Sequence, residues 1–469
     1  MDADVIVVGA GPTGLVLASE LDLAGARVVV LDRLAARSPQ SKALNLQPRT
    51  AELLDARGWL APIAERAFAN VPGGHFAGLR LDYAVFDTRF PYQVGIPQGR
   101  VEEALEARLA GAGVPVLRGT ELLRLEQDAD GVALAVGGPE GKWTLRAAYA
   151  VGADGGRSRV RKELGVAFPG RDGRVSMAVA DVVLAEDPRL PTEWRIPNLE
   201  PSASRSGFLI PLEDNAYRFV FASQEQQELG RDAPITEEEV RAALRDAHGD
   251  AAKLLHIRYA SRFTDASRQA EHYRTGRVFL AGDAAHIHSP AGGQGLNLGV
   301  QDAFNLGWKL GAAVAGWAPE GLLGTYHTER HPVAARVLQN TRAQGVLLVP
   351  DPDVLALRAI TAELAATPDG NRLLAGMISG LEIRYHMPDG PAHPLLGARL
   401  PDVELHSGRG LLLGGPPGIA DGWRDRVDHT PGDPGDVRLV RPDGYVCFAG
   451  DPDGLRDALA RWFGAPAGV

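Results

Sequence analysis

Residues 4–33 read DVIVVGAGPTGLVLASELDLAGARVVVLDR, and this stretch decides the fold. Its first apolar run is unbroken up to Val8, which is typical of a buried parallel strand. Glycines follow, then apolar residues at helical spacing from Leu15 to Leu23, and then a second buried run over 27–31. The order strand, glycine turn, helix, strand and acid predicts a βαβ unit that binds a dinucleotide.

The glycines of this turn have separate physical uses. Gly9 permits the tight turn, Gly11 lets the backbone approach a pyrophosphate, and Gly14 lets the helix pack closely on the strand. The positive end of the helix then suits the phosphates, and Asp32, 23 residues after Gly9, suits an adenosine ribose. The predicted contacts of the loop are Gly9, Gly11, Pro12, Thr13 and Gly14.

The loop alone leaves the identity of the dinucleotide open. NAD, NADP and FAD carry the same pyrophosphate, although the carboxylate of Asp32 disfavours the 2′-phosphate of NADP. A tight strand–helix turn that binds nothing is the remaining alternative.

Composition restricts the class of protein. The chain has 469 residues, 45% hydrophobic and 23% charged, which suits about three globular domains. The net charge is −10 without a long basic run, so we expect no nucleic-acid or membrane partner. The only cysteine is Cys447, which excludes an internal disulfide and a CxxC pair. An acidic start and the lack of an apolar run of about 20 residues predict a cytoplasmic protein.

Two further predicted strands end in an acid next to glycine. Residues 148–153 precede Asp154, and residues 277–281 lead to Asp283. In an open parallel sheet these ends lie at the edge where ligands bind, and a carboxylate there accepts hydrogen bonds from the hydroxyls of a ribityl chain. Residues 290–297, PAGGQGLN, then lead into a helix whose free N–H groups suit negative charge on a flat ligand such as a flavin.

The rest of the chain gives a coarser pattern. Strands are expected over 175–223, and a Pro- and Gly-rich linker near 386–397. Helices are predicted at 48–60, 98–109, 301–315 and 326–344, the last interrupted at Pro332. The C-terminal part predicts strands at 410–413 and 438–448 and a helix at 453–463.

Taken in order, the dinucleotide loop, the Asp154 segment and the Asp283 segment resemble the three sequence motifs of the class A flavoprotein aromatic hydroxylases, the group of p-hydroxybenzoate hydroxylase. Within that group the chain is most similar to the rifampicin monooxygenases and the bacterial aromatic-polyketide hydroxylases. The residues behind this closer similarity are 276–310, 316–344, 408–413, 426–429 and 441–444.

The resemblance implies an α/β fold of three parts. The first is a Rossmann-like FAD-binding domain of the glutathione-reductase type, formed by residues 1–70, 98–171 and 275–385. An inserted, sheet-rich substrate domain comprises residues 71–97 and 172–274. A C-terminal thioredoxin-like domain without CxxC comprises residues 386–469.

The resemblance also assigns residues to the nucleotide end of FAD. Asp32 would bind the adenosine ribose, and Arg33 would lie by the pyrophosphate. Lys42 stands where close relatives carry an arginine near the cofactor, and Leu122 would pack on adenine. Asp154 belongs to the segment that serves both FAD and NADPH.

A second set of residues is implied at the flavin end. Gln98 occupies the flavin-side glutamine position, and Asp283 would bind the ribityl hydroxyls. The isoalloxazine would be surrounded by Pro290, Gly293, Gly295, Leu296 and Asn297. His286 and His288 form an HxH pair, but no third ligand stands nearby, so we expect no metal.

The implied activity is an FAD-dependent monooxygenation. NADPH, as a transient co-substrate, would reduce tightly but non-covalently bound FAD, and O2 would form a flavin C4a-hydroperoxide that hydroxylates an electron-rich polycyclic aromatic, a polyketide or rifamycin-type antibiotic. The cofactor carries this chemistry, so no catalytic side chain is assigned. The expected partner is the small-molecule substrate, and the chain is expected to be a monomer or homodimer.

Four alternatives stay open on the sequence. The first is a role in biosynthetic tailoring rather than in antibiotic inactivation. A non-hydroxylating flavin reductase of the same fold would oxidise NADPH without an oxygenated product. A flavin-free NAD-dependent dehydrogenase would take up no FAD, and a drug-sequestering flavoprotein would bind ligand without consuming NADPH.

Overall fold

A central parallel sheet organises the chain in the computed structural model, which describes residues 1–196, 199, 201, 206–222, 229, 233–387, 393–433 and 435–467. The sheet has six strands in the order β19-β20-β12-β1-β2-β8. In that order they span Arg274–Thr275, Val278–Leu280, Tyr149–Gly152, Val5–Val8, Val28–Asp32 and Val116–Arg118. All neighbouring pairs are parallel except β19 with β20.

The register of these strands aligns their carboxyl ends. Val8 of β1 lies opposite both Gly152 of β12 and Leu31 of β2, and Gly152 lies opposite Leu280 of β20. The segments that follow the strands therefore leave the sheet at one edge. The predicted βαβ unit is present, with α1 spanning Pro12–Leu23.

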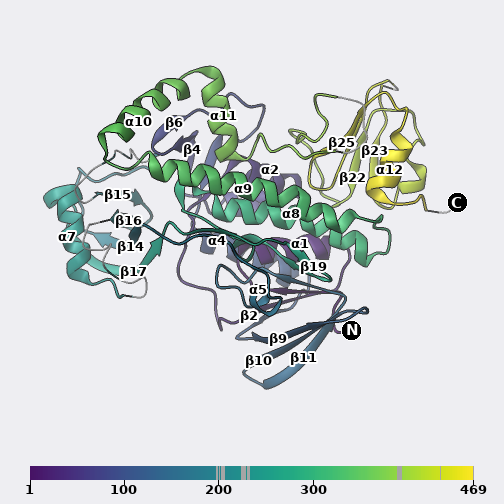
Figure 1. Cartoon of the computed structure of the whole chain (residues 1–469), viewed down its shortest axis with the longest axis horizontal. Helices are drawn as coiled ribbons and strands as arrows, with labels where there is room; N and C mark the ends of the chain where they lie inside the picture. The colour runs from purple at the N-terminus through teal and green to yellow at the C-terminus, as the bar shows by residue number, and fades with distance from the viewer. Residues whose placement is uncertain are drawn as a thin grey trace.

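Glycines let two helices pack closely on each other. A Cβ on Gly307 of α8 (Gly295–Val314) would lie 2.4 Å from the Glu20 side chain of α1, and one on Gly311 would lie 2.4 Å from the Cβ of Ala24. Since no side chain fits between the helices there, α8 presses directly on α1. Figure 1 shows α8 and α9 running side by side across the middle of the molecule.

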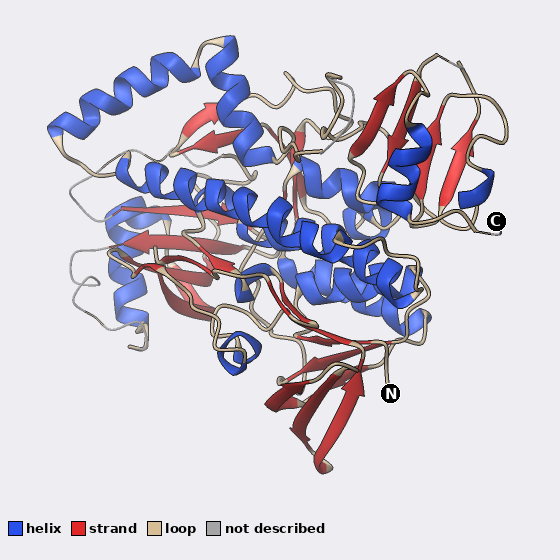
Figure 2. Ribbon diagram, turned by 45° about the vertical axis from the view of Figure 1, so that its right-hand side comes forward, coloured by secondary structure: helices blue, strands red, loops and turns tan. Residues whose placement is uncertain are grey.

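Three antiparallel strands of seven residues each form a second sheet. They are β9 (Glu121–Gln127), β10 (Val132–Gly138) and β11 (Gly141–Ala147). Figure 2 shows this sheet projecting from the body near the N-terminus. Helix α4 follows the prediction closely and spans Gln98–Gly111.

A four-stranded antiparallel sheet lies at the left-hand end of the molecule in the view of Figure 1. Its order is β15-β16-β14-β17, with bounds Ser206–Pro211, Ala216–Ala222, Ser176–Leu184 and Leu254–Thr264. The strands predicted over 175–223 are thus present. Helix α7 (Glu237–His248), which the sequence reasoning missed, buries Val240 and Leu244 in the core of this sheet.

Residues 45–95 form short helices and strands. The predicted helix at 48–60 is present as α2 (Pro48–Ala56) but ends four residues earlier, and a second short helix, α3 (Leu60–Ala64), follows it. The short strands are β3 (Asn45–Leu46), β4 (Ala69–Pro72), β5 (Gly74–Phe76), β6 (Leu79–Leu81) and β7 (Tyr92–Gly95).

Helix α9 corrects one expectation. It spans Thr325–Val346 and continues through Pro332, where an interruption was predicted. Proline removes the N–H that would reach the carbonyl of residue 328. Thr328 is exposed, so water can satisfy that carbonyl and the helix tolerates the loss. Helices α10 (Pro352–Ala365) and α11 (Pro368–Ser379) were not predicted.

The C-terminal region forms a separate small sheet with one helix. The strand order is β23-β22-β24-β25, and α12 spans Leu455–Phe463. The strands span Val427–Thr430, Gly410–Leu413, Val437–Val440 and Val446–Gly450, in agreement with the predicted strand–turn–strand. Residues 388–392 of the predicted linker lie outside the described residues.

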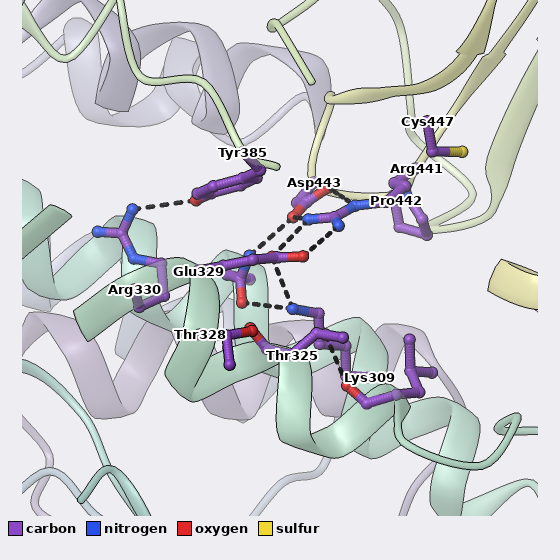
Figure 3. A network of polar contacts seen from close by, with 12 residues as sticks. Lys309, Thr325, Thr328, Glu329, Arg330, Tyr385, Arg441, Pro442, Asp443 and Cys447 are labelled. Atoms are coloured by element: carbon purple, nitrogen blue, oxygen red, sulfur yellow. Dashed lines mark hydrogen bonds and ion pairs between the residues drawn. The ribbon is translucent and has the colours of Figure 1, made fainter. Parts of the chain in front are cut away.

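A buried charge network joins this region to α8 and α9. Glu329 of α9 accepts hydrogen bonds from Arg441 Nη1 at 2.6 Å and from Lys309 Nζ of α8 at 2.8 Å. Asp443 accepts from Arg441 Nε at 3.0 Å, and all four side chains are at most 5% exposed. Figure 3 shows Glu329 between the lysine and the arginine, with Asp443 beside Arg441.

The network keeps its charges despite burial. Burial lowers the pKa of Lys309 to about 8, and the carboxylate of Glu329 opposes that fall. Burial would raise the pKa of Glu329, but Arg441 and Lys309 hold that pKa well below its ordinary value. Each charge therefore depends on its partners, because an unpaired charge in this position is costly.

Two arginines of the N-terminal part extend the contact. Arg57 donates from Nη2 to the carbonyl of Pro442 at 2.8 Å and forms a buried ion pair with Glu20. Arg49 donates to the carbonyl of Asp443 at 2.9 Å. Asn305 of α8 donates to Asp443 at 3.1 Å, so helices α2, α8 and α9, together with Arg57 after α2, all hold the turn between β24 and β25.

Replacing Arg441 by methionine should destabilise the protein strongly. The change leaves Glu329 and Asp443 buried without their shared cation, and breaking such a pair costs about 3–5 kcal/mol. Urea denaturation measures the loss. The matched control is Arg424→Met, because Arg424 pairs with Asp421 in a largely exposed position and should change stability by less than about 1 kcal/mol. Equal losses in the two variants would contradict the role of the network.

Candidate functional site

The loop after β1 leaves open space at one glycine. A Cβ on Gly9 would lie 2.3 Å from the carbonyl oxygen of Ala153, and one on Gly14 would lie 1.9 Å from that of Gly9. Gly9 also has a φ of +114°, which L side chains rarely adopt. At Gly11, by contrast, a Cβ would meet no described atom within 4 Å. Gly9 and Gly14 therefore serve the packing of the loop, and Gly11 borders free space.

The first turn of α1 has unsatisfied N–H groups facing that space. Pro12 is the first helical residue, Gly11 precedes it, and no side chain of the described residues caps this end. Such a helix end favours an anion. The side chain of Thr13 is already used in packing, because its hydroxyl lies 2.6 Å from a Cβ built on Gly282 and 2.3 Å from one on Gly299.

Asp32 braces the loop from the end of β2. Its Oδ2 accepts a hydrogen bond from the N–H of Ala10 at 2.8 Å, and its Oδ1 accepts one from the N–H of Leu34 at 2.8 Å. Each carboxylate oxygen keeps a further lone pair, which suits a ribose hydroxyl. Arg33 is exposed beside it.

Two residues assigned to the nucleotide end have side chains in other surroundings, one in solvent and one in the apolar core. Lys42 is exposed, and its carbonyl accepts a hydrogen bond from Arg218 at 3.4 Å. Leu122 is 3% exposed and belongs to the main apolar core. Its side chain therefore packs on protein, and the adenine contact stays a prediction.

Asp154 follows β12, and one of its two carboxylate oxygens accepts hydrogen bonds from the protein. Its Oδ2 accepts from the N–H groups of Arg159 at 2.6 Å and Val160 at 3.1 Å, at the start of α5 (Arg159–Glu163). Its Oδ1 is buried and has no hydrogen-bond partner among the described residues. One oxygen thus positions the helix, and the other is left without a partner among the described residues.

Asp283 follows β20 in a short turn, and its side chain is exposed. No described residue donates a hydrogen bond to its carboxylate. The preceding Gly282 has a φ of +60° and contacts Thr13, so the turn packs against the start of α1. The acid and the dinucleotide loop therefore lie close together.

The start of α8 is held by Asn297. Its Oδ1 accepts from the N–H of Gln47 at 2.7 Å, and its Nδ2 donates to the carbonyl of Gly293 at 2.8 Å. Asn297 is 2% exposed, so it shapes the turn rather than presenting its amide to solvent. Gly293 has a φ of +62°, and a Cβ there would lie 2.4 Å from Asn45. The other residues predicted here are Pro290, which is exposed, and Gly295 and Leu296, which open the helix.

Gln98 fastens a neighbouring segment at the start of α4. Its Oε1 accepts from the N–H of Ala43 at 3.2 Å, and its Nε2 donates to Glu102 at 2.8 Å. Burial raises the pKa of Glu102. Gln98 is thus a positioning residue for the segment that contains Lys42, and its own ligand contact stays a prediction.

Sequence reasoning missed Asp302, which connects these parts. The residue lies on α8, is fully buried, and accepts at Oδ2 from the N–H of Gly282 at 3.1 Å and from His286 at 2.7 Å. Its Oδ1 accepts from Arg330 at 2.7 Å. Burial would raise the pKa of Asp302, but Arg330 and His286 lower it, so the carboxylate stays charged. The sequence did offer one signal for it, since Asp302 is an acidic residue within the largely apolar sequence of α8.

The site is therefore one edge of the sheet, reached by three distant segments. It offers open space at Gly11, two helix starts without side-chain caps, and acceptor oxygens at Asp32, Asp154 and Asp283. These groups suit a ligand with a pyrophosphate, hydroxyls and a flat ring, which is the chemistry of FAD. Among the described residues, no cluster of three metal-binding side chains is found.

A cavity of about 300 Å³ lies away from this edge. It is lined by Tyr149, the first residue of β12, and by Arg274 and Leu323. It is therefore at the other end of β12 from Asp154 and has no part in the site.

Comparison with known proteins agrees with this site. Residues 2–341 match the FAD binding domain family, and residues 393–466 match the C-terminal region of aromatic-ring hydroxylases. The chain belongs to the class A flavoprotein aromatic hydroxylases. The predicted family, FAD as cofactor and monooxygenase activity are thereby confirmed.

Three similar proteins describe the relationship. The hydroxylase is 49% identical to the 12-dehydrotetracycline 5-monooxygenase/anhydrotetracycline 6-monooxygenase of Streptomyces rimosus over the full length of both chains. It is 45% identical to the rifampicin monooxygenase of Streptomyces venezuelae, covering 98% of this chain and 99% of that one. The solved structure of an anhydrotetracycline hydroxylase from Streptomyces rimosus superposes with a TM-score of 0.90 at 48% identity, covering all of both chains. In the part of the hydroxylase that the structure describes, no helix is long and apolar enough to cross a membrane.

Gly11→Val should abolish tight FAD binding while the fold stays intact. The valine meets no described protein atom, so its side chain enters the space predicted for the pyrophosphate. Fluorescence quenching of FAD by the apoprotein measures binding, and thermal unfolding of the apoprotein checks the fold. Gly111→Val is the matched control, because its Cβ also meets open space but lies at the end of α4. Unchanged FAD affinity in Gly11→Val would refute the assignment of the loop.

Asp283→Ala should weaken FAD binding by about tenfold or more, because charge-assisted hydrogen bonds to hydroxyls contribute about 1.5–3 kcal/mol each. Stability of the apoprotein should hardly change, since the carboxylate is exposed. Asp283→Asn keeps an acceptor without the charge, so its affinity should lie between those of wild type and Asp283→Ala. Equilibrium dialysis against FAD compares the three proteins, and equal affinities would show that Asp283 has no role in binding.

Proposed function

We propose that the hydroxylase uses NADPH and O2 to hydroxylate a polycyclic phenolic compound of the polyketide or rifamycin class. The observation that supports this most is the full-length similarity to enzymes whose names specify a tetracycline and a rifamycin. Fold similarity does not determine the substrate, so the proposal extends to the class and not to one compound.

Different site residues are proposed to bind different parts of the cofactor. We assign the pyrophosphate to the start of α1, the adenosine ribose to Asp32 and the ribityl hydroxyls to Asp283, with Asp154 Oδ1 as a further acceptor. When bound, FAD supplies the redox chemistry, and the protein orients it and excludes water. The free N–H groups at the start of α8 favour negative charge on the ring, because they carry the positive end of the helix dipole.

The middle sheet is proposed to cover the flavin and bind substrate. Its strand β16 carries Arg218, which is paired with Asp181 and reaches the carbonyl of Lys42 in the segment next to the predicted cofactor site. Phe219 and Phe221 are stacked at 4.7 Å and buried in the core of this sheet, so they are not assigned to the substrate pocket. NADPH is proposed to dock transiently over the same site, because the sequence has no second GxGxxG loop.

The finer organisation belongs to the same proposal. We propose three domains with the boundaries expected above, of which the C-terminal one is thioredoxin-like but structural. Its Cys447 is buried, and burial raises the pKa of the thiol, which disfavours the reactive thiolate. A cytoplasmic location and a monomeric or homodimeric state complete the proposal.

A substrate panel tests the activity. Purified holoenzyme is assayed with anhydrotetracycline, rifampicin and phenol, and both NADPH consumption and product mass are recorded. We expect a product 16 mass units heavier, one oxygen atom, from at least one polycyclic compound, with slower turnover of phenol. NADPH oxidation without any oxygenated product would favour the non-hydroxylating alternative instead. Preference for rifampicin would support antibiotic inactivation, and preference for anhydrotetracycline would support biosynthetic tailoring.

A further inference from the structure

His288 has a defined tautomer in the segment between Asp283 and α8. Its Nδ1 lies 2.7 Å from the carbonyl oxygen of Ser289. A carbonyl can only accept a hydrogen bond, so Nδ1 carries the proton. In the neutral ring Nε2 is then left with a lone pair and acts as an acceptor.

That acceptor has no protein donor among the described residues. The Nε2 atom is buried and unpartnered, and a Cβ built on Gly295 would lie 3.8 Å from it. Gly295 is the first residue of α8, whose start is free of side-chain caps from described residues. The unpartnered nitrogen therefore lies beside the helix end that we assign to the flavin.

The neighbouring His286 does not supply the missing donor. Its Nε2 lies 2.7 Å from Asp302, and because a carboxylate accepts, that nitrogen carries the proton. In the neutral ring its Nδ1 is then also an acceptor, and that atom too is buried without a partner in the described structure. Two acceptors cannot bond each other, so an external donor is needed.

The charge state of His288 limits what it can do. Burial lowers its pKa to about 4, His286 adds to this effect, and Asp283 opposes it. The ring is therefore neutral near pH 7. It is also too weak a base to hold the proton of a phenol, whose pKa is near 10 for the tyrosine side chain. Its chemistry is that of an acceptor, not of a general base.

We propose that His288 contacts the ligand, accepting at Nε2 a hydrogen bond from an N–H or O–H group on the planar ring bound at the start of α8. The inference rests on the proposed function, and two ring systems offer such a donor there. One is the imide N–H of the flavin, and the other is a phenolic O–H of the substrate. Either donor satisfies a buried acceptor that would otherwise remain unpaired, which costs free energy.

Two nearly isosteric substitutions separate ligand binding from structure. His288→Asn keeps a donor at the Nδ1 position for Ser289 but lacks the Nε2 acceptor, whereas His288→Gln places an amide oxygen near the Nε2 position. His272→Leu is the control, because His272 is exposed. Thermal unfolding of the apoproteins checks the fold, and if one variant unfolds, the other is compared with wild type.

FAD affinity of the apoprotein, the flavin midpoint potential without substrate, and substrate KM are measured for each protein. If the flavin is the donor, His288→Asn should raise the FAD Kd by about two- to tenfold and shift the potential, and His288→Gln should restore both. If the substrate is the donor, His288→Asn should leave FAD binding unchanged and raise KM by a similar factor, which His288→Gln should restore.

The inference is overturned if FAD affinity, potential and KM of His288→Asn all equal those of wild type within experimental error. It is also overturned if His288→Gln and His288→Asn are equally impaired, because the acceptor is then irrelevant. Wild-type apoprotein that binds no FAD would reject the proposed function itself. If the wild-type enzyme binds FAD and His288→Asn behaves as the wild type does in every measurement, only the role of His288 is rejected.

Discussion

The matched register of β1, β12 and β20 is the constraint on which the rest of this structure depends. Because parallel strands aligned in this way end together, Gly9, Asp154 and Asp283 emerge at one edge although 145 and then 129 residues separate them along the chain (154 − 9 and 283 − 154). The close packing of α8 on α1 then places a second uncapped helix start beside the first. No single segment could hold a ligand as long as FAD; the sheet brings the partial sites together.

Buried pairs of charged side chains connect this edge of the sheet to other parts of the molecule. Two turns into α8, Asp302 fixes the turn before Asp283 by accepting from the N–H of Gly282, and it is itself paired with Arg330. Further along the same helix, Lys309 joins Glu329 and, through it, Arg441 of the C-terminal sheet (Figure 3). The helix that begins at the predicted flavin position is thus the one that anchors the C-terminal region. Such buried pairs are poor sources of net stability but are costly to break, so they keep the parts in one arrangement.

Some residues that were expected to bind the cofactor have side chains that already contact other parts of the protein. Sequence reasoning assigned Thr13, Leu122 and Asn297 to the cofactor, but their side chains are occupied by packing or by hydrogen bonds to the protein. The residues with unused capacity are instead Asp154, with one bare oxygen, and His288, with one bare nitrogen. The family motifs therefore mark the location of the site, and within it the unpartnered atoms of Asp154 and His288 are the buried positions at which we propose ligand contacts.

The βαβ unit, the two later strand ends and the helix after residue 290 were predictable, because each is a local pattern of apolar runs, glycines and acids. The motif order also sufficed to recognise the family and its cofactor. Helices α7, α10 and α11 were not predicted although their starts carry local signals, Thr236 before three glutamates and Asp351 and Thr367 each before a proline. The continuity of α9 through Pro332 was not predicted because it depends on packing and solvation. The roles of Asp302 and His288 required the folded chain. A hydrogen bond between residues 20 positions apart, or the absence of a partner for one ring nitrogen, exists only once the chain has brought those atoms together.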